Sequence, residues 1–88
     1  MNIREIKLAI TIGLMNSGNY LNTIQELMQR LVAEVGAFIG QQIVHNAMLD
    51  QEHTIQTLAL QYENCTLNID LIQNNTTQLQ YVNRFDVY

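Results

Sequence analysis

The segment Leu31–Val44 constrains the fold more than any other part of the chain, because almost all of its side chains are apolar. Its polar members are one glutamate and two glutamines, and Gly36 and Gly40 lie four residues apart within it. The segment is also part of a longer series of apolar residues, from Ile24 to Ala47, in which each is three or four residues from the next. The spacing predicts one long helix, which is too apolar all round to face solvent along one side.

A shorter helix is predicted before it, over about residues 2–16. Asn2 and Glu5 have the spacing of a capping box, and Gly18 follows as a stop signal. Apolar residues between these signals recur at helical spacing, at Ile3, Ile6, Ile10 and Leu14. The second helix then covers about residues 19–50, with Asn19 or Asn22 as its N-cap.

After Asp50 the apolar pattern changes from a helical period to a period of two. Alternation in three successive segments predicts strands at about 54–62, 65–72 and 77–87, separated by asparagine-rich turns. We therefore expect a single α+β domain over residues 1–88. It has a short N-terminal helix, a long apolar second helix and a three-stranded antiparallel β-meander.

An all-α helical bundle is the alternative, because apolar residues of the C-terminal half also step by three and four. That series is Ile55, Leu58, Tyr62, Cys65, Ile69, Ile72, Thr76 and Leu79. Two observations oppose the bundle. Asparagine and threonine, which are poor helix formers, are dense between residues 64 and 77, and a helix would leave Leu60, Leu67 and Leu71 on its polar face.

The long apolar helix predicts self-association, because the rest of so small a chain cannot cover all of its sides. Small residues would allow close approach of a second copy, and a two-fold dimer is the commonest arrangement. The predicted oligomer interface consists of Ala33, Gly36, Ala37, Gly40 and Val44. The alternative is that the glycines accommodate packing within one chain.

Charge and cysteine usage exclude several classes of partner and environment. Eight acidic residues against four basic ones give a net charge of −4, which disfavours nucleic-acid binding. Cys65 is the only cysteine, so no internal disulfide forms, and we expect it to be a small buried residue. No apolar run is long enough to cross a bilayer, and residues 1–17 lack the cleavage site of a signal peptide. We expect a cytoplasmic protein without a membrane segment.

No catalytic or metal-binding motif is present in the sequence. It has no nucleophile elbow, glycine-rich phosphate loop or paired cysteines. His45 and His53 are eight residues apart, too far for adjacent helical turns, so no metal and no cofactor are expected. The candidates for ligand binding are His45, Tyr62 and Tyr81, and the two tyrosines lie in phase with the predicted core faces.

These features leave three functional hypotheses. The first is a small, non-enzymatic, self-associating interaction module that binds or inhibits a larger protein. The second is a small-ligand-binding protein whose pocket lies at the oligomer interface, near His45, Tyr62 and Tyr81. The third is a small enzyme that uses His45 or His53 as an acid or base.

Overall fold

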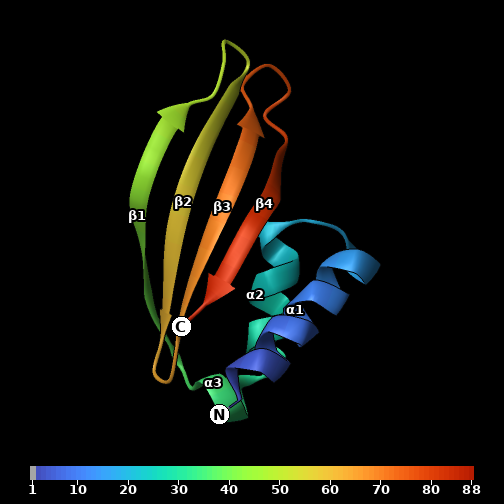
Figure 1. Cartoon of the computed structure of the whole chain (residues 1–88), viewed down its shortest axis with the longest axis vertical. Coiled ribbons are helices and arrows are strands. Elements are labelled where there is room, and N and C mark those ends of the chain that lie inside the picture. Colours follow the sequence, from blue (N-terminus) through green and yellow to red (C-terminus); the bar gives the residue numbers. More distant parts are fainter. Residues whose placement is uncertain (1) are drawn as a thin grey trace.

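Three helices precede a four-stranded antiparallel sheet in the computed structural model, which describes residues 2–88. The elements are α1 (Ile3–Ser17), α2 (Leu21–Arg30), α3 (Val32–Val35), β1 (Phe38–Met48), β2 (His53–Tyr62), β3 (Thr66–Asn74) and β4 (Gln80–Val87). The strands form a meander in the order β1-β2-β3-β4. The helices lie together on the β4 side of the sheet, beside its lower half, and β1 forms the opposite edge (Figure 1). The α+β class is therefore confirmed.

The first helix begins and ends at the signals in the sequence. The Asn2 side chain accepts a hydrogen bond from the backbone N–H of Glu5 at 3.3 Å. Gly18 follows the last helical residue with φ of 98°, a conformation that suits glycine. The buried residues of this helix are Ile6, Ile10 and Leu14, and all three belong to the core. This helical spacing is the amphipathic pattern that positions α1 on the core.

The predicted long apolar helix is wrong. α2 ends at Arg30, the four-residue α3 ends at Val35, and the chain from Phe38 onward is a strand. Gly36 has φ of 82°, and a Cβ there would lie 2.6 Å from the Cβ of Glu63, so the helix stops where only glycine fits. The next residues include β-branched side chains, which lose rotamer freedom in helices and favour strands. The segment therefore adds a fourth strand.

The three strands that the period of two predicts after Asp50 are present as β2, β3 and β4, and β1 precedes them as the fourth strand of the antiparallel meander. The all-α bundle is wrong. Leu67, Ile69 and Leu71 face the helices and are 0–1% exposed, as strand alternation requires. Leu60 stands opposite Leu67 on β2, so the two central strands present one continuous apolar face.

That face and the helices form one buried core. Its members are Ile6, Ile10, Leu14, Ile24, Met28, Val35, Leu58, Leu60, Tyr62, Cys65, Leu67, Ile69, Leu71, Val82 and Val87. Each fully buried aliphatic side chain contributes about 1.5–3 kcal/mol relative to its exposed state. Residues from the helices and from the strands share this one core. Packing against the sheet therefore stabilises the helices, which are too short to be stable through intrinsic helix propensity.

One irregularity redirects the side chains of β4. Asp70 pairs with Arg84 but Leu71 pairs with Val82, so Asn83 is an extra residue in the strand. Such a bulge shifts the alternation by one position. Val82 consequently lies in the core, and Tyr81, which the sequence placed in phase with the core, is 44% exposed. We call the face of the sheet turned away from the helices the open face, and Tyr81 lies on it.

The alternation along β3 predicts opposite effects for two neighbouring substitutions. Ile69→Asp places an unpaired charge in the core and should unfold the chain, because a buried charge without a partner is very costly. Asn68→Lys changes the open face, where its register partner is Asp86, and should alter the free energy of unfolding by less than about 0.5 kcal/mol. Urea titration at one fixed chain concentration measures both. Equal effects of the two variants would contradict the assignment of the faces.

Candidate functional site

β1 is an edge strand, and nearly all of it is exposed. Nine of its eleven residues are exposed and the other two are half-buried. Six large apolar side chains on or next to this strand are more than half exposed: Phe38, Ile39, Ile43, Val44, Met48 and Leu49. We call residues 38–49 the β1 edge. A long apolar edge of this kind is a template for pairing with another chain.

The β1 edge also carries no Asp, Glu, Lys or Arg. The segment between Glu34 and Asp50 has no such residue, although the whole chain has a net charge of −4. Charged side chains on an edge strand normally prevent it from pairing with a neighbouring sheet. That protection is missing here over the full length of the strand.

The ladder between β1 and β2 determines which backbone groups remain free. The Leu49 N–H donates to the His53 carbonyl at 2.9 Å, and the Ala37 carbonyl accepts from the Glu63 N–H at 3.0 Å. In an antiparallel pair the residues alternate between bonding the partner strand and pointing away from it. With the register of β1 on β2, the residues that turn their backbone groups away from β2 are Gln41, Ile43, Asn46 and Met48.

The other edge of the sheet is protected. The Val82 N–H of β4 donates to the Asn19 carbonyl in the α1–α2 connection at 2.6 Å. Lys7 of α1 reaches across to Asp86, with 2.6 Å between Nζ and Oδ1. Asp86 and Arg84 also supply charged side chains of the kind that keep edges from pairing. The two edges of the sheet therefore differ: the β4 edge is bonded to the helices and charged, whereas the β1 edge is exposed and uncharged.

Hydrogen bonds from the β2–β3 turn hold the start of β1. The Glu63 side chain accepts from the Ala37 N–H at 2.6 Å, and the Asn64 N–H donates to the Val35 carbonyl at 2.9 Å. The Asn64 side-chain amide donates to the Glu34 carbonyl at 3.0 Å. Because Val35 is fully buried, this junction fixes where the exposed strand leaves the core.

The five residues predicted to form a helix–helix interface do not share one helix. Ala33 lies in α3, Gly36 and Ala37 connect α3 to β1, and Gly40 and Val44 lie on β1. A Cβ at Gly40 would meet no other atom of the chain within 4 Å, so this glycine is not needed for packing within residues 2–88. The predicted residues thus cluster near the β1 edge, and their role in an interface stays a prediction.

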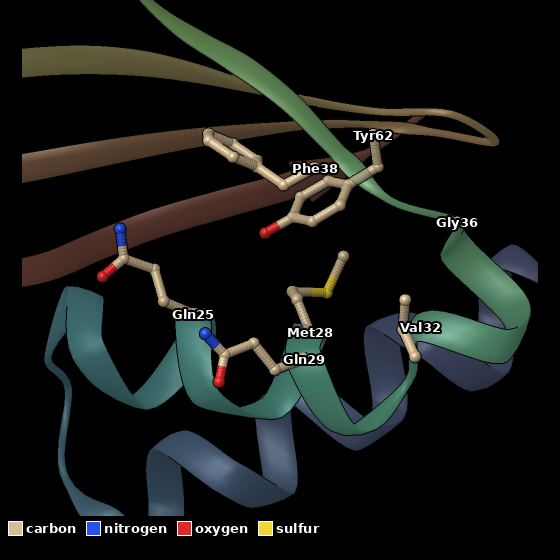
Figure 2. A pocket seen from close by; sticks show the side chains of 7 residues that line it. All are labelled: Gln25, Met28, Gln29, Val32, Gly36, Phe38 and Tyr62. Atoms are coloured by element: carbon tan, nitrogen blue, oxygen red, sulfur yellow. The ribbon is translucent and has the colours of Figure 1, made fainter.

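A pocket of about 420 Å³ lies between α2 and the start of β1. We call it the α2–β1 pocket, and its lining residues are Gln25, Met28, Gln29, Val32, Gly36, Phe38 and Tyr62 (Figure 2). None of them is charged. The rings of Phe38 and Tyr62 form a tilted pair with centroids 5.3 Å apart, and their pairing joins β1 to β2 at this point.

The Tyr62 side chain is buried, but its hydroxyl is directed into this pocket. The residue is 5% exposed, and its hydroxyl is not a buried atom without a partner, since no such side-chain oxygen or nitrogen occurs among residues 2–88. Figure 2 shows the hydroxyl pointing into the space between the rings and α2, where Gln25 and Gln29 carry amides. Burial raises the pKa of Tyr62 above 10.0, which keeps the hydroxyl neutral and able to donate.

Of the three predicted ligand-binding residues, the structure places only Tyr62 in this pocket. His45 and Tyr81 lie on the open face, because their positions alternate with those of the core residues. The sequence analysis missed Gln25, Gln29 and Phe38. The four-residue spacing of the two glutamines, which puts them on one side of α2, was the available signal.

A second hollow, of about 500 Å³, lies on the open face. One row of register partners crosses it on all four strands: His45, Thr57, Asp70 and Arg84. The Thr57 hydroxyl donates to Asp70 at 2.7 Å, and Arg84 Nε lies 3.4 Å from Asp70 Oδ2. These cross-strand contacts pair the polar groups with one another, and they stabilise the sheet without requiring a ligand.

His53, the other histidine, contacts Asp50 in the β1–β2 turn. Asp50 accepts hydrogen bonds from the backbone N–H groups of Glu52 and His53, both at 2.8 Å. His53 Nδ1 also lies 3.0 Å from Asp50 Oδ1. The backbone bond from Glu52, followed by the His53 side chain, lowers the pKa of Asp50 below 3.8. The turn that ends β1 is thus stabilised by its own side chains.

Several kinds of site are not found in the described part of the chain. Residues 2–88 contain no cluster of three or more His, Cys, Asp or Glu side chains able to hold a metal ion. No helix among them is both long and apolar enough to span a membrane. Cys65 is buried, and burial raises the pKa of its thiol, which reduces its reactivity. No protein-family model, curated protein or solved structure matches the chain.

The ion pair on the protected edge predicts a selective change in one pKa. The hydrogen bond from Lys7, followed by that from the Val87 N–H, lowers the pKa of Asp86 below 3.8. Lys7→Met should raise this pKa toward 3.8 and leave that of Asp50 unchanged, since Asp50 has other partners. Carboxyl ¹³C NMR titration of both aspartates measures it.

The sign of the accompanying stability change also follows. A carboxyl whose pKa is lower in the folded chain stabilises it above about pH 3.8, and that contribution is lost as the pH falls through the folded-state pKa. Lys7→Met should therefore reduce the loss of stability on acidification. An unchanged pKa of Asp86 in the variant would contradict the assigned ion pair.

Proposed function

We propose that this chain is a non-enzymatic interaction module that self-associates through the β1 edge. The observation that supports it is the contrast between the two edges of the sheet. β4 is bonded to the α1–α2 connection and carries charges, whereas β1 has free backbone groups and apolar side chains without charge. An exposed edge without a charged side chain over eleven residues favours pairing with another strand.

The charge distribution favours a second copy of this chain as the partner. Two copies with a net charge of −4 repel each other, and the β1 edge is a long stretch where neither brings a charge to the contact. A two-fold axis perpendicular to the sheet would pair the two β1 strands antiparallel. The product is a continuous eight-stranded sheet, four strands from each copy, with both helical layers on one face.

One register satisfies the free backbone groups of both strands. It places Ile43 opposite Asn46 of the second copy and Gln41 opposite Met48 of the second copy. All four residues turn their backbone groups away from β2, and all four side chains lie on the helix side of the sheet. In this register the free N–H and C=O groups of one strand meet those of the other, and the side chains of paired residues lie on the same face of the sheet. An antiparallel ladder requires both conditions.

Two bulges interrupt β1, and the proposed register takes them into account. The register on β2 shifts between Phe38 and Gly40 and again between Ile43 and His45. The regular stretches 40–43 and 45–48 lie on either side of the second bulge. In the proposed dimer residues 40–43 of one copy pair with residues 45–48 of the second copy, and the reverse. The second bulge of each copy then lies at the two-fold axis, opposite the same bulge of the other copy.

An acid–base enzyme has less support. His45 belongs to the cross-strand row on the open face, and His53 is bonded to Asp50 in the β1–β2 turn. The two histidines therefore do not converge with a nucleophile on one point, which general acid–base chemistry needs.

A charge placed in the middle of the β1 edge should prevent self-association. Ile43 is 56% exposed, so Ile43→Lys leaves the core of one chain intact while placing two like charges near the proposed two-fold axis. We expect wild type to have twice the 10.1 kDa mass of the chain at high micromolar concentration, and the variant to have that of one chain. Light scattering coupled to size exclusion measures both masses.

Met15→Lys is the matched control, since Met15 is 79% exposed on α1, away from the β1 edge. This variant should remain a dimer, and circular dichroism should show that both variants keep the wild-type fold. A wild type with the mass of a single chain at high micromolar concentration would contradict the proposal. An Ile43→Lys variant that dimerises like wild type would also contradict it.

A further inference from the structure

We infer that the α2–β1 pocket binds a small, uncharged molecule with a flat apolar ring and one amide or carbonyl group. The inference stands on the pocket of a single chain and does not depend on self-association. At about 420 Å³ the pocket has the size of ordinary small-ligand sites. Its walls define the chemistry of the occupant.

The apolar walls select a ring. Phe38 and Tyr62 contribute two aromatic rings from neighbouring strands, and Met28 contributes a thioether from α2. Aromatic rings pack on one another in offset or edge-to-face geometry, and methionine sulfur makes favourable contacts with them. A flat ring that enters between the strands and α2 would contact all three side chains.

The polar groups select a hydrogen-bonding group without charge. The Tyr62 hydroxyl points into the pocket from a side chain that is mostly buried. The hydroxyl itself is accessible to solvent there, because no buried side-chain oxygen or nitrogen among residues 2–88 lacks a hydrogen-bond partner. Gln25 and Gln29 place amides on the α2 side of the same space, and an amide both donates and accepts. A carbonyl oxygen would accept from the hydroxyl. An ionised ligand would meet no opposite charge in the lining.

Methionine methyl groups provide a direct readout, because Met28 and Met15 lie in different places. Met28 lines the pocket, whereas Met15 is 79% exposed on α1. We would label the methionine methyls with ¹³C and titrate the protein with benzamide, benzoate and toluene. Benzamide should shift the Met28 signal with a midpoint at or below about 1 mM and leave Met15 unmoved. Benzoate should bind at least about tenfold more weakly, because its charge loses water without gaining a partner.

Tyr62→Phe tests the role of the hydroxyl, since it removes one oxygen and keeps the ring. The variant should weaken benzamide binding about five- to tenfold and leave toluene binding unchanged. Val32→Phe changes a side chain that is 52% exposed and lines the pocket, and it should abolish the Met28 shift by filling the space. Ile43→Lys, which removes the proposed dimer contact, should bind benzamide as wild type does.

Four results would overturn the inference. They are a Met28 signal that millimolar benzamide does not move, equal binding of benzoate and benzamide, no effect of Tyr62→Phe on benzamide, and loss of binding in folded Ile43→Lys. The last result would mean that a second copy completes the pocket, so it separates failure of this inference from failure of the self-association proposal.

Discussion

The packing of the α1–α2 hairpin against one half of the sheet is the constraint on which the rest of the structure depends. Ile10, Ile24 and Met28 are buried against the face that Leu60 and Ile69 present. Short helices with weak intrinsic stability are held in place by this contact. Because the helical layer lies toward β4, it covers the inner strands and leaves β1 outside the core (Figure 1).

The same asymmetry explains why the two edges of the sheet differ. On the β4 side the nearby helices can reach the edge, and Asn19 and Lys7 do so through a backbone hydrogen bond and an ion pair. On the β1 side nothing in residues 2–88 occupies the free backbone groups of Ile43 and its alternate neighbours. The exposed strand and the adjoining α2–β1 pocket are thus two consequences of one incomplete helical layer. We propose a second copy for the strand and a small uncharged molecule for the pocket.

The sequence predicted the elements whose periodicity was unambiguous and failed where two periods overlapped. Strict alternation at Leu67, Ile69 and Leu71 identified the meander, and the capping residue Asn2 identified the start of α1. In Leu31–Val44 almost every side chain is apolar, so helical and strand periods both fit, and the helical interpretation makes Gly36 a packing residue. Its positive φ and its close approach to Glu63 depend on a tertiary contact that the sequence does not reveal. The sequence does not predict the α2–β1 pocket for a related reason, since the helical spacing places Phe38 in a helix. The bulge that exposes Tyr81 likewise leaves no clear local signal beyond Asn83.

Hydrogen exchange along β1 tests the central claim most directly, because the strand contains its own controls. The amides of Gln42 and Ala47 alternate toward β2, whereas those of Gln41, Ile43, Asn46 and Met48 point away from it. In the proposed dimer the second group is protected at high micromolar concentration and loses that protection on dilution, while Gln42 and Ala47 stay protected throughout. If the outward-pointing amides exchange at the rate of free backbone at every concentration, β1 does not pair with a second copy and the account is wrong.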